Sequence, residues 1–309
     1  MELIRGEHNL RPRHRGCVAT IGNFDGVHIG HQAVLESLVH CARERGLPAT
    51  VIVFEPQPAE YFAGESAPAR LTRLREKVML LSGLGIDRLL ILRFDAALAA
   101  LPADEFVRRI LIEGLGVQSL TIGDDFKFGK RRTGDFSVLQ RFAQRHGFVL
   151  RRADSLLLEG ERVSSTLIRA KLLAGEMRGV ECMLGRRYFI AGRVVHGHKR
   201  GREIGFPTAN LDLHRIKSPL AGIYAVSVRG LGGAPIPGVA YLGSRPIIDD
   251  PRFVLEVHLF DFDAECYGKH LEVEFVAKVR EDMVFSSFDA LSAQIAKDCE
   301  AARVMIAAA

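Results

Sequence analysis

Short apolar runs alternate with amphipathic stretches through the first half of the chain. Runs rich in β-branched and aliphatic residues predict strands, and apolar positions spaced three and four residues apart predict helices. The predicted strands are 17–21, 50–54, 88–93, 119–122 and 148–151, and the predicted helices are 31–45, 71–84, 104–115 and 136–146, with one more opening at 164–165. Such an alternation predicts a doubly wound parallel sheet of the α/β class.

The pattern changes after Gly185. Strand-like segments at 189–196, 223–229, 237–242, 253–260 and 270–279 are separated by clusters of Gly, Pro and Asp. This spacing predicts a small antiparallel β-barrel. A last amphipathic segment, 288–305, is expected to form a helix that packs against the barrel. The boundary is expected within 175–185, which gives domains at 1–182 and 183–309.

Composition fits this organisation. A chain of 309 residues, 48% of them hydrophobic, can bury two cores, because a domain holds roughly 100–200 residues. Its five cysteines are dispersed without a Cys-x-x-Cys pair, which indicates neither a disulfide framework nor a zinc site. The N-terminus is charged, and no apolar run reaches the ~18 residues of a membrane span. We expect a soluble, cytoplasmic protein with reduced thiols and no membrane partner.

The densest motif of the first domain is Gly-Asn-Phe-Asp-Gly-Val-His-Ile-Gly-His, residues 22–31, directly after the first strand. Its glycines let the backbone approach a ligand, and the helix that starts here offers free N–H groups to phosphate. His28 and His31 share one helical face, where they could stabilise the phosphates during adenylyl transfer. Two such histidines alone are typical of an exposed first turn, but the Gly-rich strand–helix setting favours a phosphate site.

Two further segments, 53–58 and 123–135, follow the second and fourth strands. The carboxyl ends of parallel strands meet at one sheet edge, so both segments are expected beside the histidines. The second one mixes four cations with aromatics and glycines, a pattern that suits either nucleic acid or a phosphate and a stacked flavin; its position favours the small ligand. Hydroxyls at 164–166 either cap a helix or bind ATP phosphates.

The connection 192–210 opens the second domain. It is rich in Gly and Arg, and its backbone N–H groups could wrap phosphates. Thr208 and Asn210 are two residues apart, so an extended backbone points both side chains to one face, as a shared Mg²⁺ and phosphate site requires. An Asx-rich turn is the alternative. In the strand around 253–260, Glu256 and His258 are expected to share a face.

These motifs resemble those of prokaryotic bifunctional riboflavin kinase/FAD synthetases, over residues 16–303. The resemblance implies a first domain of the nucleotidyltransferase type that converts FMN and ATP to FAD and diphosphate. It implies a riboflavin kinase-like barrel, with its C-terminal helix, that converts riboflavin and ATP to FMN and ADP. The implied partners are these small molecules with Mg²⁺, and not nucleic acid. The resemblance implies no particular oligomeric state.

The same resemblance implies roles for individual residues. His28 and His31 are the catalytic residues of adenylyl transfer, and Glu256 accepts the proton of the riboflavin terminal hydroxyl. Mg²⁺ is assigned to Thr208 and Asn210. In the first site, ATP is assigned to Gly22, Asn23, Phe24, Asp25, Gly30, Ser164, Ser165, Thr166 and Arg169, and the flavin to Pro56, Asp125, Phe126, Phe128 and Arg131. In the kinase site, ATP and flavin are assigned to Gly192, Gly201, Gly205, Pro207, Tyr267, Gly268 and Arg280.

The chain departs from the family pattern at Tyr241, Ile247, Cys266 and Asp282, where Asn, Thr, Leu and Glu are usual. A phenol at 241 is expected near the mouth of the barrel, where it would narrow the flavin pocket or stack on the flavin. The alternative is that Tyr241 fills the barrel core and affects stability alone.

Three other functions are compatible with parts of the sequence. Aminoacyl-tRNA synthetases also carry His-Ile-Gly-His, but this chain lacks a Lys-Met-Ser-Lys-Ser segment and an evident tRNA-reading domain. The net charge of +5 would suit a nucleic-acid-binding module, whose binding would fall steeply with salt. A flavin-binding regulator would bind riboflavin in the barrel without phosphorylating it.

Overall fold

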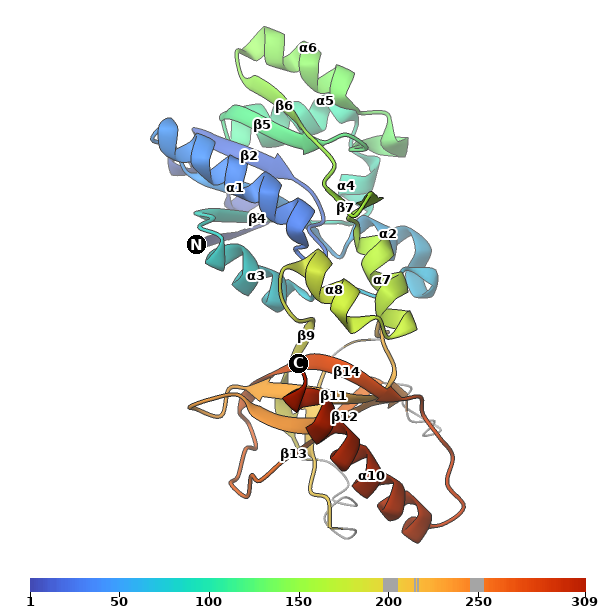
Figure 1. Cartoon of the computed structure of the whole chain (residues 1–309). Coiled ribbons are helices and arrows are strands. Elements are labelled where there is room, and N and C mark those ends of the chain that lie inside the picture. Colours follow the sequence, from blue (N-terminus) through green and yellow to red (C-terminus); the bar gives the residue numbers. More distant parts are fainter. Residues whose placement is uncertain (197–204, 214, 216, 245–252) are drawn as a thin grey trace. The chain divides into compact units, whose positions relative to one another are not determined.

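The computed structural model describes residues 1–196, 205–213, 215, 217–244 and 253–309 (Figure 1). The chain divides into two compact units. The first contains residues 1–68 and 72–164, and the second contains residues 69–71 and 165–309.

A parallel sheet of six strands lies at the centre of the first unit, in the order β1-β4-β3-β2-β5-β6. The strands are β1 (Glu2–Arg5), β2 (Cys17–Ile21), β3 (Ala49–Glu55), β4 (Arg88–Arg93), β5 (Val117–Gly123) and β6 (Val149–Ala153). From β2 the chain winds outward to β3 and β4, and then returns to β5 on the other side of β2. The predicted doubly wound sheet is thereby confirmed, and its switch point lies between β2 and β5.

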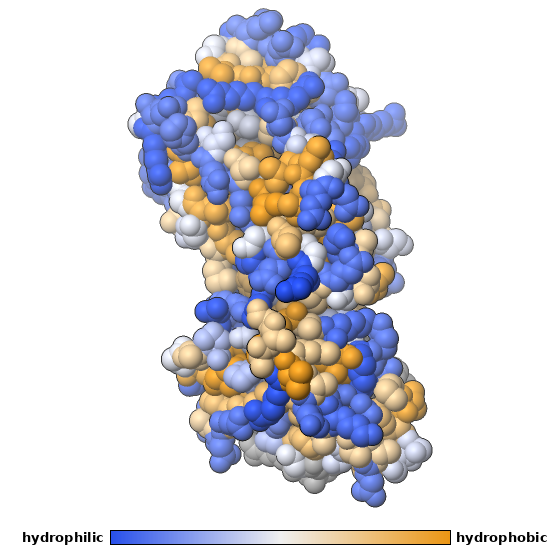
Figure 2. Space-filling model, in the orientation of Figure 1, coloured by the Kyte–Doolittle hydropathy of each residue, from blue (hydrophilic) through white to orange (hydrophobic). Residues whose placement is uncertain are grey.

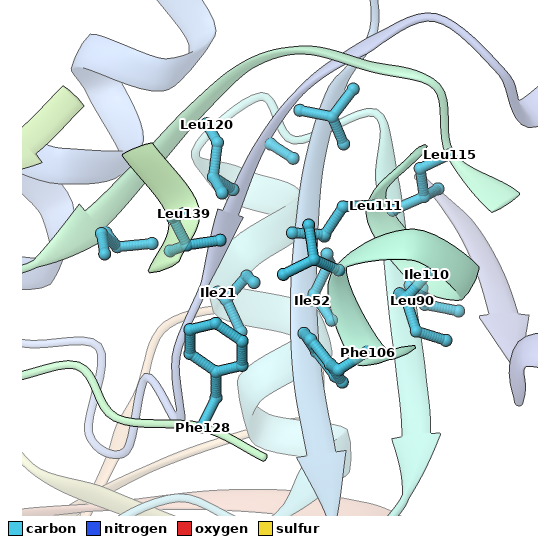
Figure 3. Close-up of a cluster of buried hydrophobic side chains, with 14 of the residues drawn as sticks. Ile21, Ile52, Leu90, Phe106, Ile110, Leu111, Leu115, Leu120, Phe128 and Leu139 are labelled. Carbon is cyan, nitrogen blue, oxygen red and sulfur yellow. The ribbon is translucent and has the colours of Figure 1, made fainter. Parts of the chain in front are cut away.

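Alternate residues of the central strands enter two separate cores. Ile52 lies in the core shown in Figure 3, together with Leu111 and Leu139, whereas its neighbours Val51 and Val53 lie in the core of the opposite face. Strands buried on both faces are characteristic of parallel sheets covered by helices. The helices of this unit are α1 (Ile29–Glu44), α2 (Pro58–Ala63), α3 (Leu74–Gly83), α4 (Ala96–Ala100), α5 (Ala103–Phe106) and α6 (Phe136–His146).

Shorter elements complete the first unit. They are the helical turns η1 (Glu7–Asn9), η2 (Pro12–His14), η3 (Gly64–Ser66) and η5 (Lys130–Arg132), the π-helix η4 (Val107–Gly114), and the two-stranded sheet of β7 (Leu157–Leu158) and β8 (Glu161–Arg162). The single helix predicted at 104–115 is therefore α5 followed by η4. Hydrophobic periodicity does not distinguish α-helical from π-helical turns in so short a segment.

Six antiparallel strands close a barrel in the second unit, in the order β10-β13-β12-β11-β14-β9. They are β9 (Phe189–Val195), β10 (Ala209–Asp212), β11 (Gly222–Arg229), β12 (Ile236–Ser244), β13 (Phe253–Leu259) and β14 (His270–Arg280). The sequence predicted five of these strands and missed β10, because four residues are too few for an alternation to be recognised. The predicted barrel is confirmed.

In the described part of the second unit, the helices are α7 (Ser165–Ala174), α8 (Met177–Leu184) and α10 (Phe288–Ala307). The last of them packs on the outside of β11, β12 and β14, as predicted for the C-terminal segment. The segment 69–71 belongs to this unit because Tyr188 Oη donates to the Leu71 carbonyl oxygen at 3.0 Å and Arg215 Nη1 donates to the Arg70 carbonyl oxygen at 2.8 Å. The compact units thus divide between Ser164 and Ser165, ahead of the predicted boundary at 182.

The visible surface of each unit mixes hydrophilic and hydrophobic residues (Figure 2). Among the described residues, no helix has both the length and the apolar character that crossing a bilayer requires.

Candidate active sites

A buried carboxylate holds the loop after β2 to the segment that precedes α3. Asp25 is 3% exposed, and its Oδ1 accepts hydrogen bonds from Thr72 N at 2.9 Å and Thr72 Oγ1 at 3.2 Å. The Gly26 N–H donates to Thr72 Oγ1 at 2.9 Å. Phe24 and Val27 have φ angles of 47° and 43°, which cost of order 1–3 kcal/mol outside glycine. The contacts of Thr72 hold the loop in this strained conformation.

His28 caps the first turn of α1, and this contact fixes its tautomer. Its Nδ1 accepts the His31 N–H at 3.2 Å, so the proton of the neutral ring is on Nε2. The rings of His28 and His31 stack with their centroids 3.5 Å apart. A Cβ at Gly30 would lie 3.2 Å from His28 Nδ1, so glycine leaves room for this ring. The structure brings the two histidines together, as the sequence predicted.

His31 is a neutral imidazole at physiological pH. Burial lowers the pKa of His31 well below 6.5, and electrostatic interactions with His28 and Lys77 lower it further. His31 Nδ1 is buried and has no hydrogen-bond partner within the described part of the chain. A buried ring nitrogen in this condition gains a hydrogen bond when a ligand oxygen reaches it. The pair of histidines therefore suits a phosphate group placed at the N-terminus of α1.

The segment after β5 is adjacent to this loop because β5 pairs with β2. Phe126 is half-buried and stacks on Phe128, with centroids 5.4 Å apart. Phe128 is only 6% exposed and belongs to the hydrophobic core of the first unit, so Phe126 packs on a buried ring. Asp125 is exposed, and its Oδ2 lies 3.7 Å from Arg162 Nη2. Arg131 is also exposed. Of the two predicted flavin-stacking rings, Phe126 is the one that a ligand can reach.

Other predicted residues lie at the same edge of the sheet. Pro56 is exposed after β3, and Asn23 is exposed after β2, the neighbouring strand. A Cβ at Gly22 would lie 3.0 Å from the Phe24 ring, so this position favours glycine.

The hydroxyl-rich motif at 164–166 spans the division between the units. Ser164 ends the first unit, and α7 begins at Ser165 in the second. Thr166 is exposed, and Arg169 Nε donates to the Ala69 carbonyl oxygen at 2.6 Å. A contribution of these four residues to phosphate binding stays a prediction.

In the second unit, three of the predicted kinase residues, Asn210, Glu256 and Arg280, lie in one row across the outer wall of the barrel. Asn210 of β10 is paired with Glu256 of β13, and Glu256 with Tyr241 of β12. The row continues through Ile223 of β11 to Arg280 of β14. Paired residues of neighbouring strands share a face, with their Cβ atoms about 5 Å apart. The barrel thus brings Asn210 and Glu256 together from segments that are far apart in the sequence.

The row faces outward because its neighbours fill the interior. Leu255 and Val257, on either side of Glu256, are fully buried, whereas Glu256 is half-buried. Tyr241 likewise lies between the buried Ala240 and Leu242, and packs against the outer cluster under α10. The predicted alternative that Tyr241 fills the barrel interior is therefore wrong.

Thr208 directly precedes β10, and Asn210 is the second residue of this strand. Asn210 Nδ2 donates to the Thr208 carbonyl oxygen at 3.4 Å. His258 Nδ1 is 2.8 Å from the Pro207 carbonyl oxygen and must be the donor, since a carbonyl only accepts. This bond joins β13 to the segment that carries Thr208. His258 shares the outer face with Glu256, as predicted from the alternation.

Tyr267 and Gly268 belong to the turn before β14. The Tyr267 ring lies 3.9 Å from the ring of His196, and the Gly268 N–H donates to the Val194 carbonyl oxygen at 2.9 Å. Cys266, next to them, is half-buried.

Three predicted glycines differ in their surroundings. Gly192 lies within β9, where a Cβ would meet the Asp212 carbonyl oxygen at 3.0 Å. Gly205 has a φ of +85°, which favours glycine. Gly201 lies outside the described residues, as does Ile247.

Comparison with known proteins covers both units. Residues 10–167 match the family model described as FAD synthetase, and residues 184–306 match the one described as riboflavin kinase. A bifunctional riboflavin kinase/FMN adenylyltransferase of Haemophilus influenzae is 49% identical over 98% of this chain and 98% of its own length. The enzyme of that name from Pseudomonas fluorescens is 51% identical over 99% of this chain and 98% of its own. The chain belongs to the family of bifunctional riboflavin kinase/FMN adenylyltransferases.

A solved structure supports the same fold for this family member. A crystal structure described as a macrolide-efflux protein from Streptococcus pneumoniae has a TM-score of 0.83 and 28% sequence identity to this chain. The match covers 98% of this chain and 99% of that one.

Two residues of the adenylyltransferase unit were not recognised from sequence. Thr72 holds the Asp25 loop through side-chain and backbone contacts. Lys77 is fully buried on α3, yet its charge is close enough to lower the pKa of His31. No local motif marks either residue, because each acts on a residue nearly fifty positions earlier in the chain.

Arg280, a predicted ligand-binding residue of this family member, also anchors α10. Its Nε and Nη2 donate to Asp298 at 2.9 and 2.7 Å, and Asp298 is 4% exposed. Arg280→Met is expected to lower the free energy of unfolding of the second unit by about 3 kcal/mol, because it leaves a buried carboxylate without its cation.

Denaturant unfolding measures this change, with Arg229→Met as the control. Arg229 pairs with Glu274 at the surface of the same barrel, where an ion pair contributes less than about 1 kcal/mol. Equal losses in the two variants would contradict the anchoring role.

Proposed function

We propose that the chain makes both flavin cofactors, FMN from riboflavin and FAD from FMN. The observation that carries this proposal is that both family models match in order, each on a unit with its own set of polar residues suited to phosphate. The second unit phosphorylates riboflavin with ATP and releases ADP. The first unit transfers the adenylyl group of a second ATP to FMN and releases diphosphate.

In adenylyl transfer, the FMN phosphate attacks the α-phosphate of ATP, and diphosphate leaves. Negative charge develops on the transferred group and on the leaving oxygen, and no enzyme nucleophile is needed. His28 Nε2–H and the imidazole of His31 are positioned at the N-terminus of α1 to donate hydrogen bonds to these oxygens. Hydrogen bonds from neutral imidazoles add no positive charge that would hold the product diphosphate.

The flavin contacts, and the nucleotide contacts that come from the first unit, are proposed along the same edge of the sheet. Phe126, resting on Phe128, offers its face to the isoalloxazine ring, with Pro56, Asp125 and Arg131 around it. For ATP we propose the loop Gly22–Asp25, Gly30 and the motif residues Ser164, Ser165, Thr166 and Arg169.

In the kinase unit, Glu256 accepts the proton of the riboflavin terminal hydroxyl, and that oxygen attacks the γ-phosphate of ATP. Glu256 is paired with Asn210 across the two strands, which supports a base close to the proposed metal site. For the nucleotide and the flavin we propose Gly192, Gly201, Gly205, Pro207, Tyr267, Gly268 and Arg280.

The donor set at the start of β10 fits Mg²⁺, a hard cation that prefers oxygen ligands. The Thr208 hydroxyl and the Asn210 amide oxygen would hold it, with ATP phosphates completing the coordination. When bound, Mg²⁺ neutralises charge on the reacting phosphates.

We further propose that the functional domains are 1–182 and 183–309, and that the protein acts in the cytoplasm. The second family model begins at residue 184, which supports this division. All five cysteines are free thiols, which supports a reducing compartment.

Each half-reaction can be tested with its own substrate. FMN with ATP and Mg²⁺ should yield FAD and diphosphate, and riboflavin with ATP and Mg²⁺ should yield FMN and ADP. Excess EDTA should stop both reactions, and added Mg²⁺ should restore them. Full activity in EDTA would contradict the metal assignment, and failure of one half-reaction alone would remove that activity from the proposal.

A further inference from the structure

Tyr241 is held in one orientation by two contacts on the outer wall of the barrel. Its hydroxyl donates to Asp282 Oδ2 at 3.0 Å. Its ring lies along β12 over Gly243, where an added Cβ would come within 2.6 Å of Tyr241 Cζ. In the row across the sheet, the residue paired with it on β13 is Glu256. An aromatic ring with a fixed position therefore lies next to the proposed catalytic base.

The acceptor, Asp282, belongs to the segment 281–287, which connects β14 to α10. Asp282 Oδ1 accepts the Met283 N–H at 2.8 Å, so this carboxylate also orders the backbone that follows it. Arg280 Nη1 and Lys278 Nζ hold the preceding residue, Glu281, at 2.9 and 2.6 Å. The segment is thus attached to β14 on one side, and through Tyr241 it is attached to β12.

Segment 281–287 exposes apolar side chains to solvent. Met283 is 50% exposed and Val284 is 100% exposed. The Phe285 ring lies beside Arg280, with the guanidinium carbon 5.7 Å from the ring centroid. Exposed apolar side chains on a connection between two elements depend on a few polar contacts for their position, and the bond from Tyr241 is one of these.

We propose that Tyr241 is a positioning residue of the kinase site, which acts through its hydrogen bond to Asp282. This bond keeps segment 281–287 in place as a wall beside the Glu256 surface, so that riboflavin meets a preformed site. The inference rests on the proposed kinase function of the second unit. Preforming a wall lowers the ordering cost of binding, so the bond affects riboflavin affinity more than the rate of phosphoryl transfer.

The test is a double-mutant cycle in the full-length protein, with Tyr241→Phe, Asp282→Ala and the double variant. Tyr241→Phe keeps the ring on Gly243 and removes only the hydroxyl. We expect each single variant to raise the riboflavin KM roughly fivefold, the factor for one net hydrogen bond, with kcat nearly unchanged. The double variant should be no worse than Asp282→Ala alone. Quenching of riboflavin fluorescence on binding gives the same comparison without turnover.

Tyr224→Phe is the matched control. Tyr224 lies in the barrel interior, and its hydroxyl donates to the Ala221 carbonyl oxygen at 3.1 Å. Loss of this hydroxyl should lower the unfolding midpoint and leave the riboflavin KM unchanged. Tyr241→Phe should instead raise the riboflavin KM and leave the unfolding midpoint nearly unchanged. Neither variant should alter adenylylation of supplied FMN.

Two outcomes would overturn the proposal while leaving the kinase function standing. One is an active wild-type protein whose riboflavin KM and affinity do not change in Tyr241→Phe. The other is a set of additive effects in the cycle, which would show that the two residues act independently. A wild-type protein that neither binds nor phosphorylates riboflavin would overturn the kinase function as well.

Discussion

His31→Ala is expected to reduce FAD formation by about 100- to 1000-fold while FMN still accumulates from riboflavin. The magnitude is that of losing one preorganised donor at developing phosphate charge. The substitution also removes the ring that stacks on His28 at 3.5 Å, so the remaining histidine loses part of its support. Kinase activity should persist because Glu256 and Asn210 lie in the other compact unit.

His40→Ala provides the control on the same helix. His40 is on α1 with its side chain 76% exposed, and its Nε2 lies 3.2 Å from Glu44 Oε1 at the surface. Both activities should survive this change. Loss of both products in His31→Ala, with the protein folded, would contradict the separation of the two sites.

The rate of adenylyl transfer should not depend on protonation of His31 between about pH 6.5 and 8, because burial keeps this imidazole neutral.

Glu256→Ala is expected to reduce riboflavin phosphorylation by about 100- to 10,000-fold, the range for loss of a general base. FMN supplied directly should still be adenylylated. Asn210→Ala should give a similar selective loss, and its defect should be relieved in part by high Mg²⁺, because it removes one of the proposed metal ligands.

Glu272→Ala is the comparison for Glu256→Ala. Glu272 is a half-buried carboxylate on β14, paired with Ala191 rather than with the row that contains Asn210. Its replacement should leave kinase activity near the wild-type level. Retained kinase activity in both Glu256→Ala and Asn210→Ala would require these residues to be reassigned.

Much of the fold followed from periodicity alone. The predicted strands 17–21 and 88–93 coincide with β2 and β4, because strands buried on both faces are continuous apolar runs bounded by polar residues. Helix α6 also has the predicted bounds, since Asp135 caps it and Gly147 ends it in a left-handed conformation. Edge strand β1 was missed because its four residues, Glu-Leu-Ile-Arg, show no clear alternation.

The candidate sites were predictable where a local motif carries them, and not where contacts are distant. His28 and His31 are neighbours on one turn, so spacing was enough to place them together. Thr72 could not be placed beside Asp25 without the fold. Tyr241 and Asp282 stood out separately as departures from the family pattern, but only the barrel register and the tertiary structure bring them into hydrogen-bonding contact.

The most direct test of the account is a time course with purified protein, riboflavin, ATP and Mg²⁺, in which the flavins are separated by chromatography. The account predicts that FMN appears first and is then converted to FAD, with ADP and diphosphate as the respective co-products. Riboflavin that remains unchanged, or FMN that accumulates without any FAD when ATP is in excess, would contradict a chain that carries both activities.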